Sequence, residues 1–208
     1  MATLFISDLH LPDERNPSTA LFESFLEHLD ATTVEALYIL GDLFDVWIGD
    51  DAAAKGYQNL MLALHDTVHR SIPIYLMHGN RDFLLGQRFA QISACQLIPD
   101  PTVINLYGTP TLLLHGDTLC TDDHAYQTFR TQVRSAEWQR KFLSMSEDDR
   151  NNAARHLREE SRRQSQSKED YLMDVNEQSV LHALKHHGVT HMIHGHTHRQ
   201  AIHSVALE

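Results

Sequence analysis

The feature that most constrains this chain of 208 residues is a repeated change from a short apolar run to a small polar motif. Residues 37–40 (Leu-Tyr-Ile-Leu) predict a buried parallel strand, and Gly41 and Asp42 follow it directly. In an open α/β sheet, ligands bind beyond the carboxyl ends of the strands, so Asp42 lies where chemistry is expected. A carboxylate after glycine is also common as a turn residue or helix cap, and for Asp42 alone that interpretation stays open.

The same change recurs after four other predicted strands, at residues 3–7, 73–77, 111–114 and 190–193. In each case residues of metal-ligand type follow the apolar run. If the chain stays extended, alternation places Asp8 and His10 on one side. The motifs are Asp8-Leu9-His10, His78-Gly79-Asn80-Arg81-Asp82, His115-Gly116-Asp117 and His194-Gly195-His196-Thr197-His198. The same alternation predicts that His194, His196 and His198 share one side.

The remaining pattern predicts an α/β protein with one helical insertion. Apolar spacing predicts a helix through Leu29 with Ser18 or Thr19 as its cap, another at about residues 57–70, and a short one passing Phe83, Leu84 and Phe89. Residues 103–106 and 111–114 predict a β-hairpin. From about 121 to 187 strand signals vanish. We predict a single domain, residues 1–208, in which this helical insertion forms a cap over the site.

Composition narrows the possible functions. The chain has 17 Lys and Arg against 28 Asp and Glu, a formal charge of −11, which argues against a nucleic-acid binder. The two cysteines, Cys95 and Cys120, lack metal-type spacing and are expected to be buried, reduced thiols of a cytoplasmic protein. We find no signal peptide and no apolar run long enough for a transmembrane helix.

A group of basic residues lies within the helical insertion. Two interpretations stay open for it: a solvated helix with ion pairs to nearby glutamates, or a surface that faces phosphate or a membrane. The group consists of Arg155, Arg158, Arg162, Arg163 and Lys168.

The donors that follow the strands are nitrogen and oxygen ligands without a thiolate. Seven donor residues are more than one ion needs. They fit two divalent ions that share one carboxylate, with Mn²⁺ a plausible choice. Two adjacent ions can activate a water as hydroxide and clamp an in-line phosphoryl displacement. Arg81 offers a planar guanidinium for phosphate oxygens, or alternatively a partner for Asp82 or another acid. The seven are Asp8, His10, Asp42, Asn80, His115, His196 and His198.

With these motifs the chain resembles the calcineurin-like metallophosphoesterases, whose patterns D-x-H, G-D, G-N-x-[DE], H-G and G-H-x-H are all present. The resemblance implies a layered αββα sandwich of β-sheets flanked by helices. It also implies two ligand sets that share Asp42. One set would be Asp8, His10, Asp42 and His198, and the other Asp42, Asn80, His115 and His196.

Arg81 narrows the resemblance, since most of that superfamily has histidine after the asparagine. Together with the Trp47-Ile48-Gly49-Asp50 run, Arg81 makes the chain similar to the UDP-2,3-diacylglucosamine pyrophosphatases of lipid A biosynthesis. That family hydrolyses UDP-diacylglucosamine to UMP and 2,3-diacylglucosamine 1-phosphate (lipid X), and its cap holds the acyl chains. The resemblance implies catalytic roles for Asp42, Asn80, Arg81 and His196, and a peripheral location on the cytoplasmic face of the inner membrane. The positions implied to contact substrate are Asn80, Arg81, Asp123, Ser161, Ser165, Lys168 and His196, with Ser165 standing where some relatives carry Asn.

Two other functions stay open on the sequence. One is a broader phosphodiesterase or phosphatase of the same fold, and the other is a non-catalytic protein-binding scaffold. The family normally continues past its final His-x-His with further strands, whereas 10 residues follow His198 here. We therefore expect this chain to be less stable than an extended one.

Overall fold

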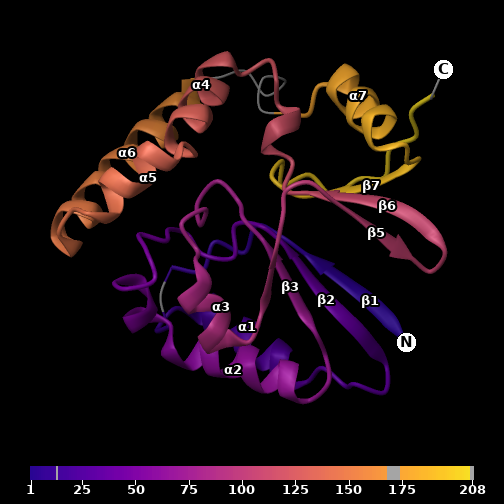
Figure 1. Ribbon diagram of the computed structural model, residues 1–208, viewed down its shortest axis with the longest axis horizontal. Coiled ribbons are helices and arrows are strands. Elements are labelled where there is room, and N and C mark those ends of the chain that lie inside the picture. Colours follow the sequence, from indigo (N-terminus) through magenta and orange to yellow (C-terminus); the bar gives the residue numbers. More distant parts are fainter. Residues whose placement is uncertain (13, 168–173, 207–208) are drawn as a thin grey trace. The chain divides into compact units, whose positions relative to one another are not determined.

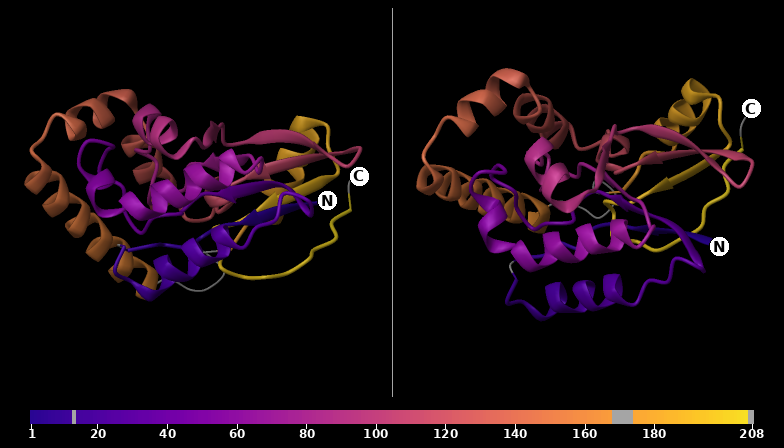
Figure 2. Two further views of the ribbon diagram at one scale, coloured as in Figure 1. Left: turned by 90° about the horizontal axis from the view of Figure 1, so that it is seen from below. Right: turned by 60° about the horizontal axis from the view of Figure 1, so that its bottom comes forward.

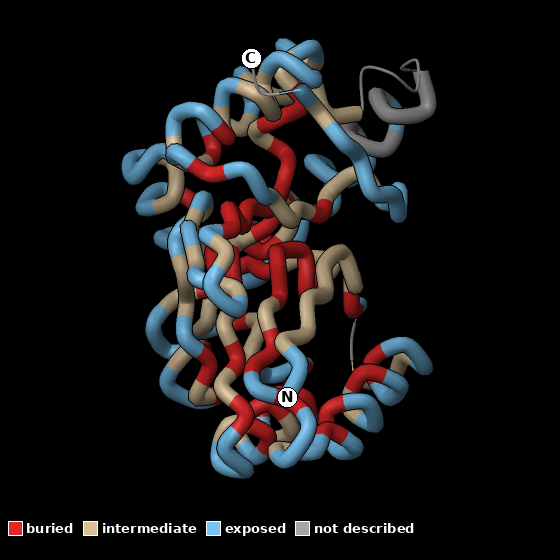
Figure 3. The backbone as a smooth tube through the Cα atoms, turned by 90° about the vertical axis from the view of Figure 1, so that its right-hand side faces the viewer, coloured by how far each residue is buried: buried red, intermediate tan, exposed pale blue. Residues whose placement is uncertain are grey.

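The computed structural model describes residues 1–12, 14–167 and 174–206, except for the side chains of 160–162 and 164–167. The chain divides into two compact units, unit 1 at Met1–Pro99 and unit 2 at Asp100–Glu208. Figure 3 shows buried stretches of the backbone in red and exposed stretches in pale blue.

Unit 1 is a parallel α/β sheet with strand order β1-β2-β3-β4. Helices α1, α2 and α3 lie on one face of this sheet (Figure 1). Parallel strands direct their carboxyl ends to one edge, so the motifs that follow β1, β2 and β3 meet there. The elements are β1 (Ala2–Ile6), α1 (Pro17–Glu27), β2 (Val34–Leu40), α2 (Gln58–His69), β3 (Ile74–Met77), α3 (Gln87–Ser93) and β4 (Gln96–Ile98).

The core of unit 1 explains why its strands form. Leu37 and Ile39 of β2 and Ile74 and Leu76 of β3 are at most 1% exposed, which confirms the prediction of buried parallel strands. Leu60 of α2, also fully buried, belongs to the helical face predicted from apolar spacing.

The local structure of unit 1 differs from the predictions at three places. Asn16, not Ser18 or Thr19, caps α1 by accepting from the Ser18 amide at 3.0 Å, and Pro17 is the first helical residue. The predicted short helix exists as α3 and contains Phe89, but it begins at Gln87, and Phe83 and Leu84 lie in the turn before it. Strand β4 was not predicted, because three residues are too few to show a periodic pattern.

Unit 2 contains a mixed three-stranded sheet of order β5-β6-β7. Strands β5 and β6 form the predicted antiparallel hairpin, and β7 pairs with β6 in parallel. The elements are β5 (Thr102–Leu106), β6 (Thr109–Leu114), α4 (His124–Val133), α5 (Ala136–Leu143), α6 (Glu147–Ser167), α7 (Glu177–His187) and β7 (His191–His194).

In the residues that the structure describes, the predicted insertion between β6 and β7 is mostly helical, while its role as a cap over the site stays a prediction. Helices α4, α5 and α6 lie together, apart from α7 and the sheet of unit 2 (Figures 1 and 2). Helix α7 packs on the sheet, where Leu184 joins Leu112 and Leu114 in one hydrophobic cluster. The described residues of the insertion thus form two parts, a group of three helices and one helix that covers the sheet.

Cys95 and Cys120 are buried and free of disulfides, as predicted, and burial raises the pKa of each thiol to about 12.

Among the described residues, no helix is long and apolar enough to cross a membrane.

Candidate metal centre

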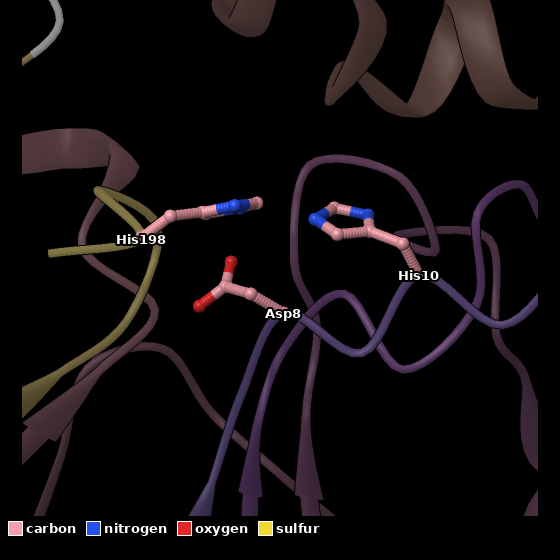
Figure 4. Close-up of side chains that lie close together, drawn as sticks. All are labelled: Asp8, His10 and His198. Carbon is pink, nitrogen blue, oxygen red and sulfur yellow. The ribbon is translucent and has the colours of Figure 1, made fainter. Parts of the chain in front are cut away.

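Three of the predicted ligands come together in unit 1. Asp8 and His10 follow β1 and Asp42 follows β2, and the loops are joined by hydrogen bonds from the Asp8 amide to the Gly41 carbonyl (3.1 Å) and from the His10 amide to the Asp42 carbonyl (3.0 Å). Asp8 offers a ligand atom within 4.8 Å of one on His10 and of one on Asp42. His10 Nδ1 lies 3.8 Å from Asp42 Oδ2. Figure 4 shows the side chains of Asp8 and His10 pointing to the same side of their loop.

The backbone at these ligands is left-handed, not extended. Asp8, His10 and Asp42 have φ values of 57°, 47° and 53°. The prediction that strand alternation aligns Asp8 with His10 was therefore wrong in its reason, because β1 ends at Ile6 and a sharp turn brings the two groups together. Such conformations cost about 1–3 kcal/mol each in non-glycine residues and are concentrated at functional sites.

Asp42 is almost fully buried and is held from two sides. Its Oδ1 accepts from the Arg81 amide at 2.7 Å, and its Oδ2 faces His10. The backbone of Gly79 packs directly on the Asp42 carboxylate, where a β-carbon would collide. Asn80 is partly buried in the same loop after β3. The structure therefore brings the Asn80–Arg81 segment to the Asp42 carboxylate.

Asp82 has a structural role that the sequence analysis missed. Its carboxylate accepts from the amides of Gly79 (2.8 Å), Leu43 (2.8 Å) and Phe44 (3.4 Å), which ties the loops after β2 and β3 together. Within the described part of the chain, the Arg81 guanidinium forms no ion pair with Asp82. The role of Arg81 toward phosphate stays a prediction. The sequence feature that could have indicated this role is the position of Asp82 at the end of the G-N-x-D pattern.

Two further predicted ligands come together in unit 2. The rings of His115 and His196 are 5.1 Å apart at 69°, and the Gly195 amide donates to the His115 carbonyl at 2.7 Å. Gly116, at φ 118°, lets the two loops approach, since a β-carbon there would lie 2.8 Å from the Gly195 carbonyl oxygen.

The predicted alternation of three histidines was wrong. Strand β7 ends at His194, whose Nδ1 lies 3.0 Å from the Gly195 carbonyl oxygen. His196 (φ 73°) and His198 (φ 55°) lie in left-handed turns after the strand. The His196 ring packs against the His115 ring, and His198 is exposed in the following loop (Figure 4).

Two buried carboxylates flank His115 in unit 2. The His115 amide donates to Asp100 Oδ1 at 3.3 Å, and Asp117 is fully buried two residues further on. Burial opposes the charged form of Asp117, but the nearby His115 and Arg130 charges and hydrogen bonds from Tyr126 and Arg130 outweigh it and lower its pKa to about 2. Burial and the neighbouring Asp117 raise the pKa of Asp100. The only sequence signal for Asp117 was its position in His-Gly-Asp.

The implied substrate contacts in the helical insertion are only partly described. Asp123 caps α4, where its Oδ1 accepts from the Tyr126 amide at 3.0 Å. Ser161 and Ser165 belong to α6 but their side chains lie outside the described part, as does Lys168 altogether. Their roles stay predictions.

Helices α4, α5 and α6 line an open cavity of about 800 Å³, in the size range of small-molecule sites. The stacked rings of Trp138 and Phe142, 4.8 Å apart, form part of its wall with Leu157. Lys141, Arg163 and Glu159 also line it, so the lining combines apolar side chains with charged groups of both signs.

Comparison with known proteins identifies the family. Residues 1–200 match the model of the calcineurin-like phosphoesterases, across both units. Proteins named UDP-2,3-diacylglucosamine hydrolase match over 207 residues, all of this chain and 86% of each relative: 51% identical in Pectobacterium carotovorum subsp. carotovorum, 49% in Serratia proteamaculans and 47% in Yersinia pseudotuberculosis. A solved Aquifex aeolicus protein of unknown function aligns with a TM-score of 0.39 at 18% identity over 64% of this chain and 72% of its own, which is too low to bear on the fold. On the matches in sequence, this chain belongs to the calcineurin-like phosphoesterase family.

Proposed function

We propose that this protein hydrolyses the pyrophosphate bond of UDP-2,3-diacylglucosamine, giving UMP and 2,3-diacylglucosamine 1-phosphate in lipid A biosynthesis. The observation that carries the proposal is identity of 47–51% along the whole chain to proteins named as hydrolases of this substrate. One water is consumed, and one P–O bond of the pyrophosphate breaks.

Membership of the family implies divalent metal ions, and the donor set fits them. We propose two ions, most plausibly Mn²⁺, held by Asp8, His10, Asp42, Asn80, His115, His196 and His198, with Asp42 shared. Five of the eight described non-glycine residues with positive φ are in this set, namely Asp8, His10, Asp42, His196 and His198. A strained backbone repeated at the ligand positions of three motifs supports a common functional cause. When bound, such ions lower the pKa of water and neutralise charge on phosphoryl oxygens.

Arg81 has a separate part in this proposal. A leaving phosphomonoester is already a good leaving group, so it needs charge neutralisation more than a proton. The guanidinium of Arg81 would supply that charge, with its backbone fixed by the bond to Asp42 and by the Trp47 amide, which donates to the Arg81 carbonyl at 3.1 Å. Asn80 and His196 would bind the substrate phosphates as well as metal. A fixed cation costs little reorganisation at the moment of reaction.

The helical insertion would take the acyl chains. The cavity beside Trp138 and Phe142 has an apolar wall, while the exposed Arg155, Arg158 and Arg163 on α6 lie on the same group of helices. A diacyl substrate stays in a bilayer, and basic side chains bind anionic lipid surfaces. We therefore propose peripheral association with the cytoplasmic face of the inner membrane.

The test is Mn²⁺-dependent release of UMP from UDP-2,3-diacylglucosamine, measured beside hydrolysis of bis-p-nitrophenyl phosphate. Rapid UMP release with slow action on the small diester is the expected result. Turnover of the small diester alone would leave a broader phosphodiesterase, and activity on neither with full Mn²⁺ binding would point to a non-catalytic scaffold. Membrane binding is tested separately, by sedimentation with anionic vesicles at low and high salt.

A further inference from the structure

Helix α4 of the helical insertion is tied to the loop that carries His115. Arg130 Nε donates to Asp117 Oδ2 at 2.7 Å, and the Tyr126 hydroxyl donates to the same oxygen at 2.6 Å. Tyr126 and Arg130 are four residues apart and so lie on one face of the helix. Gln127 adds a bond of 2.8 Å from its Nε2 to the Asp117 carbonyl oxygen. Three residues of α4 therefore hold one buried aspartate.

Arg130 also faces the second carboxylate beside His115. Its Nη2 is 3.8 Å from Asp100 Oδ2, while Asp100 Oδ1 accepts from the His115 amide. The guanidinium thus lies between two buried acids, one bonded to the His115 backbone and one two residues after it. Buried like charges repel each other unless a cation compensates them. Without Arg130, the loop at 115–117 would have to shift, protonate or admit water.

The same helix contacts the other histidine of unit 2. The Tyr126 ring lies 5.9 Å from the His196 ring, which in turn lies against His115. The Gly195 amide bonds to the His115 carbonyl, so the two histidine loops are joined through their backbones. A displacement at Asp117 would therefore reach both His115 and His196.

We infer that Arg130 is a positioning residue: through Asp117 and Asp100 it fixes the orientation of His115 and His196 and thereby sets the affinity of the protein for its metal ions. This rests on the proposed function only in that His115 and His196 are taken as metal ligands. It makes the helical insertion a determinant of metal binding in addition to its proposed role toward the acyl chains. Removing outer partners of metal ligands typically costs about 10- to 100-fold in affinity.

The experiment measures Mn²⁺ affinity directly, from the electron paramagnetic resonance signal of free Mn²⁺, without substrate. The variants are Arg130→Met, which removes the charge, and Arg130→Lys, which keeps it. The matched control is Arg140→Met on α5, where the exposed arginine bonds only to the Ala136 carbonyl of its own helix in the described interactions. Melting temperatures of the metal-free proteins are recorded in parallel.

We expect Arg130→Met to weaken Mn²⁺ binding about 10- to 100-fold, Arg130→Lys to recover most of the affinity, and Arg140→Met to bind as the wild type does. A lowered melting temperature with unchanged Mn²⁺ affinity would make Arg130 a structural residue only and overturn the inference. Should Arg130→Met fail to fold, Tyr126→Phe decides: it removes one hydrogen bond from Asp117, and unchanged affinity in that variant also overturns the inference.

The outcomes separate this inference from the proposed function. A wild-type protein that binds Mn²⁺ but does not release UMP would contradict the proposed substrate. The positioning role of Arg130 could still be tested by the same measurement of Mn²⁺ affinity. Wild type without tight Mn²⁺ binding would contradict the metal centre and the inference together.

Discussion

The backbone of Gly79 lies directly against the carboxylate of Asp42, with no room for a β-carbon between the loops after β2 and β3. Because Asp42 is the carboxylate proposed to be shared by two ions, we predict that Gly79→Ala displaces it and lowers kcat/KM for bis-p-nitrophenyl phosphate by about 100-fold. Mn²⁺ titrations of the activity provide the measurement.

The control for that change is Gly56→Ala, since a β-carbon at Gly56 meets nothing within 4 Å. It should retain wild-type activity and Mn²⁺ dependence. Full activity in Gly79→Ala would show that the Asp42 carboxylate tolerates displacement, contrary to its role as a shared ligand.

Removal of the Asp42 side chain and removal of the Arg81 side chain should impair the enzyme in different ways. Asp42→Ala should abolish turnover at any Mn²⁺ concentration, because it removes the shared carboxylate. Arg81→Ala should keep Mn²⁺ binding and lower kcat/KM by about 10- to 100-fold, mainly through KM, as expected for loss of a charged hydrogen bond to phosphate. Arg81→Lys, which keeps the charge but not the planar fork, should lie between Arg81→Ala and wild type. Steady-state kinetics with UDP-2,3-diacylglucosamine distinguish the cases, and substantial turnover by Asp42→Ala would contradict the mechanism.

In the metal-free protein, the ionised forms of the two buried acids of unit 2, Asp117 and Asp100, should change the free energy of unfolding in opposite directions. The pKa of Asp117 is lowered from 3.8 to about 2, so its ionised form adds stability above its unfolded pKa that is lost as pH falls through about 2. That difference corresponds to roughly 2 kcal/mol in the free energy of unfolding. Asp117→Asn should therefore be less stable at pH 7 and show a shallower loss of stability from pH 5 to 3.

Asp100 provides the matched comparison, because its pKa is raised. A group whose pKa is raised on folding adds stability at pH values below its unfolded pKa, and this stability is lost as pH rises through its folded pKa. At pH 7 the ionised Asp100 therefore destabilises the folded protein. Asp100→Asn keeps an acceptor for the His115 amide and should match or exceed wild-type stability at pH 7. Urea unfolding midpoints in EDTA measure both variants, and equal losses in both would refute the assigned signs.

The cavity of the helical insertion should select the lipid substrate. Leu157 lines it and is 37% exposed, so Leu157→Glu can place a charge there without unfolding the helix. We predict a raised KM for UDP-2,3-diacylglucosamine and unchanged hydrolysis of bis-p-nitrophenyl phosphate.

Leu62→Glu on α2 is the control, since Leu62 is 57% exposed and does not line the cavity. It should leave both activities unchanged. If Leu157→Glu slowed both substrates equally, the cavity would have no part in lipid selection.

Much of the architecture was predictable because it depends on local pattern. Apolar runs such as 37–40 mark buried strands, and loss of strand signals after residue 121 marked the helical insertion. The start of α1 was missed because Asn16 and Pro17 compete with Ser18 and Thr19 for similar cap roles. Local pattern does not decide between neighbouring caps.

The sequence by itself determined which residues of metal-ligand type follow which strands, since strand ends and ligand types are both local properties. Tertiary structure decided how they are presented. The left-handed turns at Asp8 and His10 depend on hydrogen bonds to the loop after β2, more than thirty residues away in the chain, and those bonds exist only when the strands pair. The bond between Arg130 and Asp117 likewise requires α4 to pack on the loop after β6. Periodicity reports which face of an element is apolar, but it carries no information on which distant backbone or charge will meet a given side chain.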